Sequence, residues 1–118
     1  AVHYLRTKFW SEVEEQHCEK AKEATVHDIE PTVIRPKGAH VICPHDHREG
    51  ASYVDSIGDE DCAGPARFML SYTWNYGVEN IVTTLTTFCL VNALSPEATT
   101  IWMCCLCINQ HRVQEQRR

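Results

Sequence analysis

The feature that most constrains the fold is a strand–helix–strand pattern over residues 66–108. Residues 67–74 form a short, mostly apolar and aromatic run, which is typical of a buried strand. A turn at 75–77 follows, and apolar residues then recur with helical spacing from Val78 to Ala93. Residues 99–108 are apolar on both faces, as in a central strand of a parallel sheet. Together these segments predict one β–α–β unit of an α/β domain.

The first 65 residues divide into two parts. Residues 3–24 predict an amphipathic helix, because apolar side chains recur on one face and charged ones on the other. Residues 25–65 are rich in Pro and Gly and predict a strand-and-loop segment, with extended pieces at 32–35, 40–43 and 51–54. We therefore divide the chain into an N-terminal helix (1–24), a strand-and-loop segment (25–65) and a partial β–α–β unit (66–118).

Composition narrows the functional classes. The net charge is −5, and 13 of the 16 acidic residues lie within residues 1–65, which argues against a nucleic-acid partner. No run approaches the roughly 18 apolar residues of a membrane-spanning helix, so we expect no membrane partner. The seven cysteines are an odd number and several lie in apolar runs, which predicts reduced thiols in a cytoplasmic protein. Because two strands and one helix cannot bury both faces of a sheet, and the sequence lacks an initiator Met, we expect a fragment of a larger domain.

Two motifs in the β–α–β unit carry a family resemblance. Residues 69–74 read Met-Leu-Ser-Tyr-Thr-Trp, and residues 101–110 read Ile-Trp-Met-Cys-Cys-Leu-Cys-Ile-Asn-Gln. The pair resembles the heterokaryon-incompatibility (HET) domain, in which a strand ending L-S-Y-x-W-G precedes a helix and a strand reading W-I-D-A-L-C-I-N-Q. A similar Cys-Cys-Leu-Cys run occurs in TIR/HET-like proteins of photosynthetic protists. The sequence departs from the HET pattern at Cys104, in place of Asp, and at Asn75, in place of Gly.

The resemblance implies a partial flavodoxin-like (TIR-like) parallel sheet. It also implies a signalling or protein-interaction module that associates with itself or with other TIR/HET-like domains and has no catalytic activity in this stretch. TIR enzymes that cleave NAD use a Glu on a later helix, and no residue of this chain matches it. The alternative is therefore part of an NAD hydrolase whose catalytic Glu lies downstream, with NAD as a possible ligand. We assign no catalytic residue.

Polar and aromatic residues follow both predicted strands. In open α/β sheets, ligands bind beyond the carboxyl ends of the strands. Aromatic rings there can stack on a base, and amide side chains can hydrogen-bond a ribose. The candidate ligand-binding residues are Tyr72, Trp74, Asn75, Tyr76, Asn109, Gln110 and His111. The alternative is that these side chains cap the strands and stabilise turns.

A His-rich loop supplies the candidate metal ligands. Cys43, His45 and His47, with Cys62 farther along, offer nitrogen and sulfur donors of the kind that zinc prefers. The spacing lacks a paired Cys motif, so a solvated loop is the alternative to a small zinc-binding module.

Three further cysteines lie in the second motif. On a strand, Cys105 and Cys107 would share one face and Cys104 would lie on the other, which predicts buried thiols and no shared metal. The predicted burial also disfavours a nucleophilic pair of Cys107 and His111, because catalytic thiols need exposed, electropositive surroundings.

Overall fold

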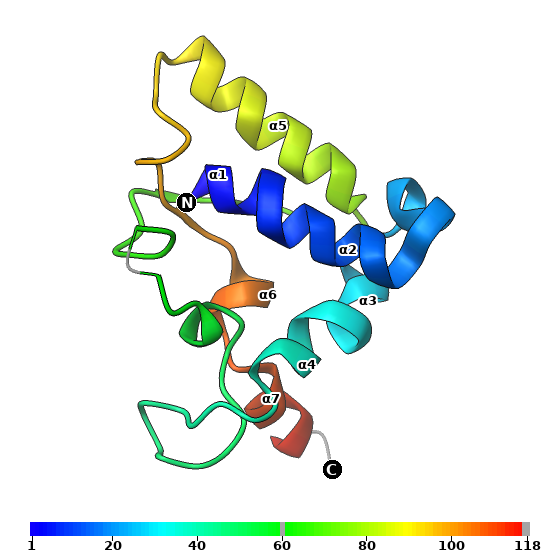
Figure 1. Cartoon of the computed structure of the whole chain (residues 1–118), viewed down its shortest axis with the longest axis vertical. Helices are drawn as coiled ribbons and strands as arrows, with labels where there is room; N and C mark the ends of the chain where they lie inside the picture. The colour runs from blue at the N-terminus through cyan, green and yellow to red at the C-terminus, as the bar shows by residue number, and fades with distance from the viewer. Residues whose placement is uncertain (60, 117–118) are drawn as a thin grey trace.

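The predicted parallel strands lie side by side. The structure is a computed structural model that describes residues 1–59 and 61–116 (Figure 1). Strand β1 (Phe68–Met69) pairs in parallel with β2 (Ile101–Trp102), with Phe68 opposite Ile101 and Met69 opposite Trp102. The amide of Leu70 extends the pairing by donating to the Trp102 carbonyl at 3.0 Å. Because α5 (Val78–Val91) connects the strands, the β–α–β order is confirmed, and the chain is a mixed α/β protein with a small parallel sheet.

Helix α5 follows the predicted apolar spacing. Val78, Ile81, Leu85 and Cys89 are buried, which places one stripe of the helix against the core. The helix ends where Ala93 takes a positive φ of 54°, and the amide of the next residue donates to the Cys89 carbonyl at 2.8 Å. This is a Schellman cap, which ends the helix before Ser95 and Pro96.

The second strand is shorter than predicted. Only Ile101 and Trp102 form β2, and Cys104–Cys107 turn into the helical segment α6. The strand predicted over 99–108 is therefore correct only at residues 101–102. A short apolar run cannot be assigned to strand or buried helix by periodicity alone. The partner strand β1 also ends at Met69, so residues 103–108 have no neighbouring strand to pair with among residues 1–59 and 61–116. The buried Met103, Cys105 and Leu106 reach the core from the helical turn instead.

The N-terminal helix is present, but it ends at His17, earlier than predicted. Segments α1 (Val2–Tyr4), η1 (Leu5–Phe9) and α2 (Trp10–His17) follow one another without a break as a single helix, which widens to a π-helical turn in η1. Its apolar side chains, among them Phe9 and Val13, are buried as predicted. Cys18 takes a φ of 50° and ends this helix, and a 3₁₀ turn, η2 (Cys18–Glu23), replaces the predicted last part.

The extended piece predicted at 32–35 is wrong, because the chain is helical there. Segments α3 (Val26–Ile29), η3 (Glu30–Ile34) and α4 (Arg35–Gly38) form a second helical run. A reciprocal capping box between Thr25 and Asp28 starts it. Both prolines in the run occupy the first two positions of a segment, where a missing amide hydrogen costs little. The prolines therefore do not break the helix. The strand-and-loop prediction had assumed that they would.

The remaining extended pieces are reduced to a single bridge. Ile42 pairs with Glu49 in one antiparallel bridge, so the strand predicted at 40–43 is only the stem of a tight loop. His47 has a φ of 59° within that loop. Residues 51–54 run as loop into the short 3₁₀ turn η4 (Val54–Ser56), so the extended piece predicted there is also wrong. These residues have no second strand alongside to pair with in the described part of the chain.

One apolar core joins all three segments of the chain. Its largest fully buried side chains include Phe9 and Ile29 from the helices and Tyr53 from the loop, and Val78 and Cys105 add the β–α–β unit. In Figure 1, α5 runs beside the N-terminal helix and α7 (Gln110–Gln116) lies near the end of α4. Among the described residues, no helix combines the length and the apolar character needed to cross a bilayer.

Candidate functional site

The hydroxyl of Tyr72 connects the end of β1 to α6. It accepts a hydrogen bond from the amide of Cys105 at 3.1 Å and lies 3.1 Å from the Cys104 sulfur. Burial is the main reason that the pKa of Tyr72 lies well above its ordinary value. Tyr72 is therefore a neutral group that ties the first motif to the second.

The turn after β1 holds the second helical run in place. The carbonyl of Trp74 accepts from the amide of His27 at 3.2 Å, and the two rings lie 5.4 Å apart. The carbonyl of Tyr76 accepts from the Val26 amide at 3.3 Å, while the Tyr76 side chain is 54% exposed. Asn75 is exposed at the tip of the turn. The backbone of this turn therefore holds the helical run that begins at Val26, while the exposed Tyr76 ring is accessible to a ligand.

A surface pocket of about 300 Å³ opens beside this turn. Its wall combines aromatic, apolar and amide groups from residues 70–72 after β1, from the turn and from the first half of α5. The lining residues are Leu70, Ser71, Tyr72, Tyr76, Asn80, Ile81 and Thr84.

The second polar group of the predicted site caps α7. The Oδ1 of Asn109 accepts from the His111 amide at 3.0 Å, as an N-cap side chain does. The Nδ2 of Asn109 donates to the Gly50 carbonyl at 2.9 Å, and the His111 ring lies 2.9 Å from the Arg35 carbonyl. Gln110 is buried. These side chains fasten α7 to the chain at residues 35 and 50.

The predicted ligand-binding residues thus fall in two places. Tyr72 and Tyr76 line the pocket beside α5, whereas His111 lines a different pocket of about 330 Å³ together with Glu49 and Arg112. The pocket beside α5, which we call the α5 pocket, brings together predicted residues from one strand end with an aromatic and amide lining.

The candidate metal ligands do not converge. In the part of the chain that the structure describes, no three His, Cys, Asp or Glu side chains come together as a metal site requires. Cys43 is buried in the stem of the loop, and His45 and His47 are exposed. The Cys62 sulfur instead approaches Asp59 Oδ2 at 3.5 Å.

The His-rich loop has a different role, which the sequence did not suggest. Asp46 accepts hydrogen bonds from Arg112 Nε at 2.5 Å and from Arg112 Nη2 at 3.1 Å, and these bonds hold the loop against α7. The guanidinium of Arg112 is the main reason that the pKa of Asp46 lies well below its usual range, and the Arg48 amide adds to the effect. Asp46 and Arg112 are 66 positions apart, and no local pattern predicts such a pair.

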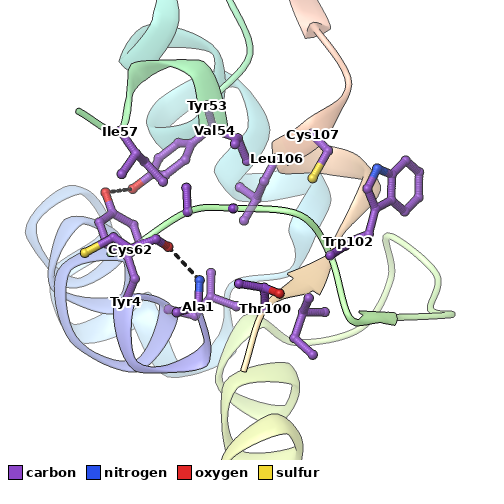
Figure 2. Close-up of a pocket in the computed structure, with 15 residues that line it drawn as sticks. Ala1, Tyr4, Tyr53, Val54, Ile57, Cys62, Thr100, Trp102, Leu106 and Cys107 are labelled. Carbon is purple, nitrogen blue, oxygen red and sulfur yellow. Dashed lines mark hydrogen bonds between the residues drawn. The ribbon is translucent and has the colours of Figure 1, made fainter. Parts of the chain in front are cut away.

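Another pocket, of about 240 Å³, lies between the N-terminal helix, residues 53–57 and 62–66, and the β2–α6 segment (Figure 2). Its wall is mostly apolar, and the Tyr4 and Tyr53 hydroxyls meet at one side at 3.0 Å. Cys107 lines this pocket, whereas His111 lies against the Arg35 carbonyl, so the two do not form a nucleophilic pair. Burial also raises the pKa of the Cys107 thiol, which keeps it protonated.

Comparisons of the chain with protein-family models, with curated proteins and with solved structures give no match. The resemblance to the HET and TIR domains therefore rests on the two motifs and on their order in the chain.

Proposed function

We propose that this chain is part of a TIR/HET-like protein-interaction module, built on a flavodoxin-like sheet, that associates with further copies of itself or with similar domains. The parallel pairing of the two motif-bearing strands, with α5 between them, supports the proposal. All seven cysteines lie in the described part of the chain and are free thiols, which is typical of a protein in a reducing compartment. We therefore place the protein in the cytoplasm.

The observation that carries the proposal is exposed apolar surface on the β–α–β unit. Leu90 and Val91, which we call the α5 tip, are 81% and 75% exposed, and Met69 on β1 is 73% exposed. Among the described residues each strand has one neighbour, so both strands leave an edge open. Open strand edges and clustered apolar side chains are the surfaces through which proteins associate.

Sedimentation velocity over a range of concentrations tests the association. We expect the mass of the native chain to rise above its monomer mass of 13.5 kDa as concentration increases. Replacing both α5-tip residues, Leu90→Lys and Val91→Lys, should keep the protein monomeric at little cost in stability, because both side chains are exposed.

Thr83→Lys is the matched control, because Thr83 is an exposed residue nearer the middle of the same helix. It should associate like the native chain. A native chain that stays monomeric throughout, or a double variant that associates equally well, would exclude the α5 tip as the contact.

The α5 pocket favours a second candidate, the binding of a nucleotide such as NAD. Tyr76 offers an exposed ring for stacking, and Asn80 offers an amide. Tyr76→Ala should weaken NAD binding by about 1–3 kcal/mol if the base stacks on this ring. Calorimetric titration measures the change, and Ile42→Ala, another exposed apolar residue outside the pocket, is the control. Cleavage would in addition require nicotinamide release by a longer form that supplies a catalytic Glu.

A further inference from the structure

The three cysteines of the second motif lie on a helical turn, and this changes which of them are neighbours. The amides of Leu106 and Cys107 both donate to the Met103 carbonyl at 3.0 Å, and the Ile108 amide donates to the Cys104 carbonyl at 2.9 Å. The motif is therefore a Cys-x-x-Cys sequence wound into one turn. Residues three apart on a helix share a face, so Cys104 and Cys107 are the adjacent pair.

Exposure separates this pair from the third thiol. Cys104 and Cys107 are both partly exposed, whereas Cys105 is fully buried. Ideal helical geometry places the Cα atoms of residues three apart at about 5 Å. A disulfide spans Cα separations of about 4.4–6.8 Å, so the pair can close with side-chain rotation and little movement of the backbone.

Tyr72 distinguishes the two accessible thiols. Its oxygen accepts from the Cys105 amide, which leaves the phenolic hydrogen free to donate to the Cys104 sulfur 3.1 Å away. Cys107 receives no such bond from Tyr72 and faces the pocket of Figure 2, at the same side as Trp102. Burial raises the pKa of the Cys107 thiol, which disfavours Cys107 as the first nucleophile. Cys104 is therefore the attacking thiol and Cys107 the resolving one.

We propose that Cys104 and Cys107 form a redox-active dithiol site that exchanges with small-molecule disulfides such as oxidised glutathione. The Cys104 thiolate attacks one sulfur of the small disulfide, forms a mixed disulfide and releases one thiol. Cys107 then loses its proton, attacks the Cys104 sulfur and releases the second thiol. Two electrons and two protons pass to the small disulfide, and a Cys104–Cys107 disulfide remains. The site does not depend on the proposed association.

The experiment equilibrates the whole folded chain with mixtures of reduced and oxidised glutathione. After an acid quench, free thiols are alkylated and the cysteine peptides are mapped by mass spectrometry. We expect a Cys104–Cys107 disulfide to form while Cys105 stays a free thiol. Cys107→Ser should trap glutathione on Cys104, and Cys104→Ser should abolish the disulfide.

Two further variants separate the mechanism from simple proximity. Cys105→Ala is the matched control and should still form the Cys104–Cys107 bond. Tyr72→Phe should slow the reaction of Cys104 with the disulfide by about fivefold at neutral pH, because the Cys104 sulfur loses the hydroxyl that lies 3.1 Å away. Circular dichroism of each variant verifies that it is folded.

Three results would overturn the proposal. One is native, folded protein in which Cys104 and Cys107 stay reduced or carry only separate glutathione adducts. Another is a bond between Cys107 and Cys62, which lines the same pocket. The third is glutathione that accumulates on the exposed Cys18 before it reaches Cys104 in the Cys107→Ser variant.

Discussion

Buried polar side chains hold several parts of this chain in place. The carboxylate of Glu30 is 5% exposed and accepts three hydrogen bonds from the Arg35 guanidinium, at 2.6–3.1 Å. Tyr53 is buried among apolar residues, and its hydroxyl donates to Glu12, which also pairs with Lys37 at 2.8 Å. A charge removed from water is tolerated only when it is paired, so these contacts are sensitive to loss of one partner.

Arg35→Met should therefore be strongly destabilising. It leaves the Glu30 carboxylate buried without its partner, which should lower the free energy of unfolding by about 3 kcal/mol. Arg48→Met is the control, because Arg48 is 58% exposed and its ion pairs are on the surface. The control should change the free energy by less than about 0.5 kcal/mol. Urea denaturation of both variants measures the difference, and equal effects would contradict the structural role of Glu30.

Cys105 should make stability fall at alkaline pH. Burial raises its pKa from 9.0 to about 12 in the folded chain. Between pH 9 and 12 the unfolded chain binds fewer protons than the folded chain, so the free energy of unfolding decreases as pH rises. Below pH 9 this thiol does not change the free energy of unfolding. Cys105→Ala should reduce that slope by up to about 1.4 kcal/mol per pH unit. Equal slopes in urea denaturation between pH 9 and 10.5 would contradict this expectation.

At the scale of elements, the sequence predicted those parts whose periodicity is long. Helix α5 and the N-terminal helix each show several turns of apolar spacing, and both are present. The helical run over 26–38 was missed because its prolines were interpreted as breaks, although Thr25 and Asp28 form a capping box and apolar residues recur after them. Turn α6 was missed because four apolar residues fit either a strand or a helix.

The end of α4 packs against the following loop at Gly38. A Cβ added at this glycine would lie 2.1 Å from the Ala51 carbonyl oxygen, which is a backbone atom and cannot rotate away. Gly38→Ala should therefore lower the free energy of unfolding by about 2–3 kcal/mol. Gly58→Ala is the control, because nothing lies within 4 Å of its added Cβ. Thermal unfolding of the two variants should differ clearly, and matching midpoints would show that α4 does not meet the loop in this way.

At the scale of the whole molecule, side chains far apart in sequence close the fold. Asp46 and Arg112 join the His-rich loop to α7, and Asn109 and His111 join α7 to residues 50 and 35. The candidate site could be predicted only in part for this reason. The sequence placed Tyr72 and Tyr76 after a strand, and they do line one pocket. It could not reveal that Asn109 and His111 would be occupied by contacts with distant carbonyls.

The proposed function depends on β1 and β2 lying parallel. Nuclear magnetic resonance of the isotope-labelled chain tests this directly through short proton–proton contacts across the strands. We predict contacts in parallel register, with Phe68 beside Ile101 and Met69 beside Trp102, and a protected Leu70 amide. Contacts that pair Phe68 with Trp102 and Met69 with Ile101 would mean antiparallel strands. That result, or the absence of any contact between the two segments, would contradict the β–α–β unit.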